Sequence, residues 1–107
     1  MPNTRSFSET IQAGLATDRE FRRALLSESI ACILAGDPET GKIVLRQYVN
    51  GTIGFPSLSE ALGRSPKSLM RMLSTTGNPQ GRNLFEIVAY LQKAEGAVLT
   101  IGAVNPA

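Results

Sequence analysis

The sequence FPSLSEALGRSPKSLMRMLS, from Phe55 to Ser74, decides which fold this chain is expected to adopt. It predicts two short helices that are joined by a tight turn. Gly63 stands where the first helix should end, because glycine accepts the left-handed backbone conformation that commonly follows a helix. Ser65 and Pro66 come next, an N-cap residue followed by a first-turn proline, so a second helix should begin there. We expect Ser57 to cap the first helix.

The second of these helices has an apolar side and a polar side. Its apolar side chains recur three and four positions apart, as on the buried face of a helix: Leu69, Met72 and Leu73. Basic and hydroxyl side chains therefore remain outside, chiefly Lys67, Ser68 and Arg71. A short helix with such an exposed side is what a helix-turn-helix protein places in the DNA major groove.

The positive charge of the chain is concentrated around the second helix. Residues 63–82 contain four basic side chains and no acidic one, whereas the remaining residues contain seven basic and nine acidic side chains. A confined basic patch beside a candidate recognition helix favours contact with DNA phosphates. The alternative interpretation is that these residues form the solvated basic face of an ordinary helical hairpin.

Four segments carry a resemblance to a known family. They are LSEALGRSPKSLMRMLS at 58–74, GNP at 77–79, the amphipathic NLFEIVAYLQKAEG at 83–96, and the apolar VLTI at 98–101. With them the chain resembles the small transcriptional regulators that carry a Cro/phage-repressor type helix-turn-helix domain and include addiction-module antidote (antitoxin) proteins. The resemblance covers roughly residues 18–101. Ser59 and Arg64 depart from the family pattern, which usually has an alanine at the first position and often an apolar residue at the second.

The residues and the resemblance together predict an all-α fold of about five helices, with a Cro/repressor-type helix-turn-helix core and a short C-terminal β-strand. We expect one domain over residues 1–107, made of a helical extension at 1–36, the helix-turn-helix core at 37–96, and a strand or tail at 97–107. The strand is predicted because AVLTI is apolar and contains β-branched residues. No other segment is strand-like, so this strand should pair with a second copy across a two-fold axis.

Composition excludes several classes of site. The chain has no histidine and one cysteine, which excludes an ordinary zinc site and a disulfide framework. We therefore expect no metal and no cofactor. No stretch approaches the 18 apolar residues that a membrane-spanning helix requires, so we expect a cytoplasmic protein without a membrane partner.

The segment GDPETGK, residues 36–42, has the spacing of a nucleotide-binding P-loop. Ile43, however, stands where a serine or threonine would hold magnesium, and Pro38 removes an amide that would bind phosphate. We expect instead that one helix ends at Gly36 and that Asp37 caps the next. Four glutamates at helix ends or on polar faces are expected to be solvated: Glu39, Glu60, Glu86 and Glu95. An enzyme is therefore not expected.

The expected function is sequence-specific DNA binding by a transcriptional regulator, a repressor that binds a two-fold operator as a homodimer. The candidate DNA-contacting residues are Arg64, Ser65, Lys67, Ser68, Arg71, Ser74, Thr75, Asn78, Gln80 and Arg82. Base edges are expected to be contacted by Lys67, Ser68 and Arg71, and phosphates by Ser65, Thr75, Asn78, Gln80 and Arg82. The resemblance also implies a role as the antitoxin of a toxin–antitoxin pair, with a cognate toxin protein bound by residues 7–35. The alternative function is a protein-interaction module without specific DNA binding.

Overall fold

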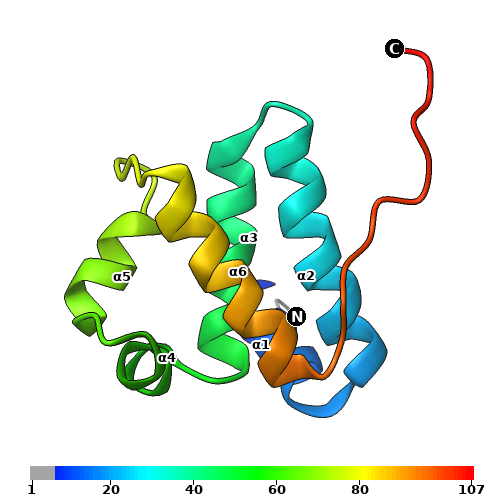
Figure 1. The fold of residues 1–107 in the computed structure, drawn as a ribbon. Coiled ribbons are helices and arrows are strands. Elements are labelled where there is room, and N and C mark those ends of the chain that lie inside the picture. The colour runs from blue at the N-terminus through cyan, green and yellow to red at the C-terminus, as the bar shows by residue number, and fades with distance from the viewer. Residues whose placement is uncertain (1–6) are drawn as a thin grey trace.

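The computed structural model describes residues 7–107, which form six α-helices (Figure 1). The helices are α1 (Phe7–Thr17), α2 (Arg19–Leu34), α3 (Pro38–Gly51), α4 (Phe55–Leu62), α5 (Pro66–Met72) and α6 (Gly81–Glu95). No β-strand occurs among the described residues. The all-α prediction is confirmed, but with six helices in place of about five.

Aspartate side chains fix where α2 and α3 begin. Asp18 Oδ1 accepts a hydrogen bond from the amide of Phe21 at 3.2 Å, and Asp37 Oδ1 accepts one from the amide of Thr40 at 3.2 Å. Each carboxylate satisfies an amide that the first helical turn leaves without a partner. The hydrogen bonds from Thr40 also hold the pKa of Asp37 below its ordinary value. The segment GDPETGK is thus a helix end followed by a helix start, as expected.

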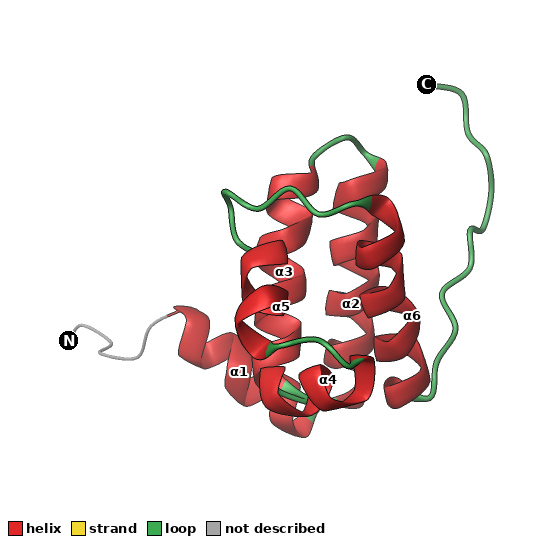
Figure 2. Ribbon diagram, turned by 60° about the vertical axis from the view of Figure 1, so that its left-hand side comes forward, coloured by secondary structure: helices red, strands yellow, loops and turns green. Residues whose placement is uncertain are grey.

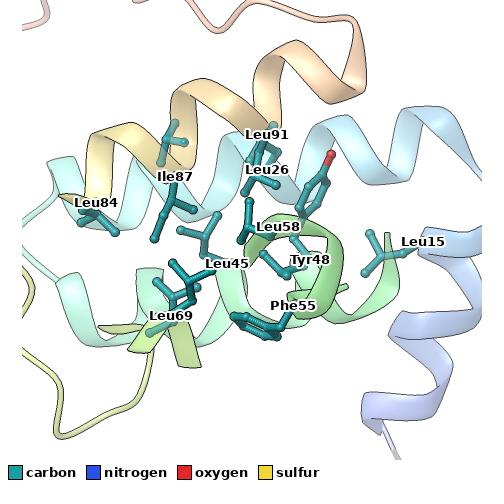
Figure 3. Close-up of a cluster of buried hydrophobic side chains, with 13 residues drawn as sticks. Leu15, Leu26, Leu45, Tyr48, Phe55, Leu58, Leu69, Leu84, Ile87 and Leu91 are labelled. Carbon is teal, nitrogen blue, oxygen red and sulfur yellow. The ribbon is translucent and has the colours of Figure 1, made fainter. Parts of the chain in front are cut away.

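One hydrophobic core joins the N-terminal and C-terminal halves of the chain. α2 runs antiparallel to α3, α1 packs against both, and α6 lies over this pair (Figure 1). The buried apolar side chains are Leu15, Leu26, Leu45, Tyr48, Val49, Phe55, Leu58, Leu69, Leu73, Leu84, Ile87, Val88 and Leu91, and they form one cluster (Figure 3). Each fully buried leucine contributes about 2 kcal/mol. Because this cluster contains residues of α1 and α2, these helices help to hold α4 and α5 in place.

A buried carboxylate ties the C-terminal end of α6 to α2 and α3. The Glu95 side chain is 5% exposed, and it accepts hydrogen bonds from Tyr48 Oη at 2.6 Å and from Arg22 Nε at 3.1 Å. Arg23 Nε lies 3.6 Å from Glu95 Oε2. Burial alone would raise the pKa of Glu95, but the hydrogen bonds from Tyr48 and Arg22 and the two guanidinium charges outweigh it and lower the pKa. Burial and the same carboxylate raise the pKa of Tyr48. The expectation that Glu95 is solvated is wrong, because α2 and α3 cover it.

α4 begins earlier than the sequence predicts. It begins at Phe55, after Gly54 with φ 80°, and no side chain caps it with a hydrogen bond. The prediction of Ser57 as the N-cap is therefore wrong. The reason is tertiary: the Phe55 ring is 4% exposed and belongs to the core, which favours entering the helix at this residue.

The C-terminal tail, residues 97–107, is not a β-strand, so the predicted strand is wrong. The tail is held near its start, where the Leu99 amide donates to Gln92 Oε1 at 2.7 Å. Beyond this point it runs clear of the helices (Figure 2), and Val98, Ile101 and Val104 are exposed. A strand requires hydrogen-bonding partners on a neighbouring strand, and the described residues of this all-helical chain offer none.

Candidate nucleic-acid interface

α4, the turn at residues 63–65, and α5 form a two-helix unit whose inner side is buried. Leu58 of α4 and Leu69 of α5 are both 0% exposed, and Leu73 after α5 is buried with them. Gly63 ends α4 in the left-handed conformation, with φ 67°, as the sequence predicts. The Ser59 hydroxyl donates a hydrogen bond to the Arg64 carbonyl across the turn. Serine at position 59, where the resemblance implies alanine, thus links α4 to the turn before α5.

The first turn of α5 is held by its own cap. Ser65 Oγ accepts a hydrogen bond from the amide of Ser68 at 3.1 Å, and Pro66 occupies the first helical turn. The expectation that Ser65 caps this helix is confirmed. Its hydroxyl hydrogen remains available as a donor, because a capping oxygen only accepts. Ser68 is half-buried at the side of the helix.

The outer side of α5 presents two cations without partners. Lys67 and Arg71 are exposed, and neither side chain forms a hydrogen bond or an ion pair with another described residue. They are four positions apart, so they lie on the same side of the helix. Met70 lies between them in sequence and is 45% exposed. This side of α5 therefore combines free positive charge with an apolar surface.

Arg64 is engaged within the chain, unlike Lys67 and Arg71. Its Nε lies 3.2 Å from Glu86 Oε1, and its Nη2 donates to Asn83 Oδ1 at 2.8 Å. Both acceptors belong to α6, so the side chain ties the turn before α5 to the start of α6. The charge that the sequence assigns to Arg64 is partly neutralised by Glu86, and its role as a free phosphate contact is reduced.

The loop after α5, residues 73–80, folds back onto the end of that helix. The Ser74 hydroxyl donates to the Arg71 carbonyl at 2.8 Å, and the Gly77 amide donates to the Ser74 carbonyl at 3.1 Å. A side chain at position 77 would collide with the Arg71 carbonyl oxygen, so this close approach requires glycine. The exposed residues of this loop are Thr75, Thr76, Asn78 and Gln80.

Arg82 lies in the first turn of α6, where a positive charge is unfavourable. The amino end of a helix carries partial positive charge, so an acidic residue would be preferred there. α6 has no acidic residue in its first turn, and Gln80 provides no side-chain cap. Arg82 is exposed and forms no ion pair with a described residue. Helix stability does not account for an arginine at this position.

The structure adds Arg46, which sequence analysis did not select. Arg46 of α3 lines a surface hollow of about 540 Å³ together with Asn50, the start of α4 and Met70 of α5. Arg46, a cation of α3, therefore lies beside the exposed side of α5. Nothing in the local sequence reveals this, because Arg46 lies outside the basic segment and its place depends on how α3 packs.

A second hollow and the metal-ligating side chains offer no better ligand site among the described residues. Between α1, α3 and α6 lies a hollow of about 490 Å³, where Arg22, Tyr48 and Glu95 bond to one another and offer little to a ligand. Within residues 7–107, His, Cys, Asp and Glu side chains form no group that could hold a metal. None of the helices in that range is long and apolar enough to span a lipid bilayer.

Comparison of the chain with models of known protein families, with curated protein sequences and with solved structures finds no match.

Proposed function

We propose that this chain is a sequence-specific DNA-binding protein that regulates transcription, and that α4 and α5 act as a Cro/repressor-type helix-turn-helix. The observation that carries the proposal is the pair Lys67 and Arg71, exposed and without ion-pair partners on one side of α5. Unpaired cations on a short, capped helix suit insertion into the major groove, where base edges offer acceptors. The resemblance of the sequence to Cro-type regulators supports the same function.

Within this proposal, α5 reads base edges and the surrounding residues hold phosphates. Arg71 can bind guanine through O6 and N7, while Lys67 and Ser68 are compatible with several bases. Phosphate contacts fall to exposed residues around α5: Ser65, Thr75, Asn78, Gln80 and Arg82. Ser74 and Arg64 support this surface from within, since Ser74 bonds to the end of α5 and Arg64 to the start of α6. Arg46 extends the basic surface on the α3 side.

Regulators with one short recognition helix commonly bind as dimers, because two half-sites supply enough contacts for specificity. We place the dimer contact on the C-terminal tail, which exposes Val98, Ile101 and Val104. Figures 1 and 2 both show the tail on the side of the molecule away from α5. A contact there would leave both copies of α5 uncovered.

Deleting residues 98–107 should therefore produce a helical monomer that binds DNA far more weakly, because each half-site alone has few contacts. Sedimentation measures the assembly state, and circular dichroism confirms that the helices remain. A truncated chain that still sediments as a dimer would move the interface to another surface, for example that of α1 and α2.

A second candidate function is supported by the N-terminal helices. Phe7 of α1 is 80% exposed and Leu34 of α2 is 67% exposed, so residues 7–35 offer apolar contacts to another protein. Such a partner would be the cognate toxin if the chain is an antitoxin. A protein-interaction module without DNA binding is the rival to the main proposal.

Selection of bound sequences from random DNA duplexes by the purified protein tests the proposal. The proposal predicts enrichment of a motif with two-fold symmetry, and retention that weakens steeply with salt, because phosphate contacts release counterions. If the folded protein enriches no common motif after several rounds of selection, the protein-interaction module is favoured.

A further inference from the structure

Lys42 of α3 is a buried cation that neither the fold nor the proposed base contacts explain. Its side chain lies inside the protein, with the residue 5% exposed. No carboxylate among residues 7–107 forms an ion pair with it. Lysine is rarely so little exposed, and a side chain that only filled this space could be apolar. The lysine is therefore expected to have another role.

The ammonium group of Lys42 reaches the loop that follows α5. Its Nζ donates a hydrogen bond to the carbonyl oxygen of Gly77. The two segments border a small hollow of about 270 Å³, whose walls include Pro38, Thr75 and Asn78. A residue near the start of α3 thus holds a loop 35 positions further along the chain.

The loop, residues 74–80, has few other attachments. Its other hydrogen bonds join residues close in sequence: Ser74 bonds to the Arg71 carbonyl and to the Thr76 hydroxyl, the Gly77 amide donates to the Ser74 carbonyl, and the Leu84 amide donates to the Gln80 carbonyl at the start of α6. Among the described residues, the Lys42 bond is the only hydrogen bond between this loop and a part of the chain distant in sequence. A loop held by one long-range bond depends on it for its position.

We infer that Lys42 is a positioning residue for DNA binding: its buried ammonium group fixes the loop so that Asn78, Gln80 and the start of α6 present their polar groups to phosphates. The inference rests on the proposed function and adds a residue that does not touch DNA. Holding the loop before DNA arrives avoids the entropy cost of ordering it on binding. The bond to Gly77 also keeps the loop against the end of α5, where Gly77 meets the Arg71 carbonyl.

The test compares Lys42→Met with Lys42→Arg and with a matched control, Lys93→Met. Lys42→Met keeps the length of the side chain and removes the donor, whereas Lys42→Arg keeps a charged donor. Lys93 is exposed in the last turn of α6, so Lys93→Met removes the same charge from a distant surface. Amide hydrogen exchange reports on loop order, and binding is measured on a selected duplex and on a scrambled duplex.

For Lys42→Met we expect amide exchange in residues 74–80 to accelerate about tenfold or more while α2 and α3 keep their protection. Affinity should fall about tenfold on both duplexes, leaving the ratio between them unchanged, because phosphate contacts carry no sequence information. Lys42→Arg should restore much of the loop protection and of the DNA affinity, and Lys93→Met should alter neither.

Unchanged loop exchange in Lys42→Met would overturn the inference, as would faster exchange with unaltered DNA affinity. Faster exchange in all helices would show a general loss of stability and would also overturn it. Should Lys42→Met fail to fold, Lys42→Gln is measured against the same expectations, because its side chain is one bond shorter and falls short of the Gly77 carbonyl. A wild-type protein that binds no duplex would remove the proposed function itself, a result distinct from a defect confined to the variant.

Discussion

The two ends of α6 use charged side chains in opposite ways. At the C-terminal end, Glu95 is 5% exposed and is held by Tyr48, Arg22 and Arg23. At the N-terminal end, Glu86 is 44% exposed and pairs with Arg64, while Arg82 has no ion-pair partner among the described residues. The charge at the C-terminal end is thus paired within the fold, whereas Arg82 at the N-terminal end remains available to a partner.

The difference follows from what surrounds each end. α2 and α3 cover the C-terminal end, so a charge there must be paired within the protein. The N-terminal end borders the loop after α5 and solvent, so an ion pair there contributes little to stability. We therefore expect that stability and the proposed DNA binding depend on separate groups of residues, and that each group can be altered by itself.

Glu95→Gln should produce the largest change in stability. It keeps the size of the side chain but removes the charge that compensates Arg22 and Arg23, and the expected loss is about 2 kcal/mol in the free energy of unfolding. This figure lies below that for a fully buried pair, because both arginines are partly exposed. Urea denaturation measures it. Glu86→Gln is the matched control and should change stability by at most about 0.5 kcal/mol. Equal losses in the two variants would remove the contrast between the ends of α6.

Acid should gradually remove the stabilisation that the Glu95 charge contributes to the wild-type protein. The folded state holds the pKa of Glu95 below its ordinary value of 4.5, so the unfolded chain binds the proton more readily. The stabilisation is therefore complete above the unfolded pKa and is lost as the pH falls through the folded pKa. Between about pH 6 and pH 4 the wild-type protein should lose less stability than Glu95→Gln removes, because Glu95 is protonated in the folded state mainly at lower pH. Thermal midpoints across this range should fall more for wild type than for Glu95→Gln, and parallel curves would show that another group titrates.

Local chemistry made much of the helical architecture predictable. Asp37 and Ser65 cap helices where the sequence indicates, and Gly63 ends a helix in the left-handed conformation. In each case a single side chain, or the lack of one, satisfies backbone groups within a few positions. Such interactions can be inferred from the order of residues alone.

The features that the sequence does not reveal depend on distant parts of the chain. The tail has the composition of a strand, yet a strand forms only with a neighbouring strand. Arg64 has the sequence context of a DNA contact, but Glu86 and Asn83 lie 22 and 19 positions away and hold it. Lys42 and Arg46 have their places because α3 packs near α5, and no local pattern shows this. The exposure of Lys67 and Arg71 on α5 could therefore be predicted from the sequence, whereas the contacts of Arg64, Lys42 and Arg46 could not.

The most direct test of the central claim compares Arg71→Ala with Arg82→Ala on specific and scrambled duplexes at several salt concentrations. Both side chains are exposed, so neither change should unfold the protein. Arg71→Ala should cost about 1–3 kcal/mol per half-site on the preferred sequence and relax selectivity at one base pair, because a base contact is lost. Arg82→Ala should weaken binding to both duplexes alike and lower the salt slope by about one unit per half-site. Unchanged binding by folded Arg71→Ala would contradict the assignment of α5 as the helix that reads DNA.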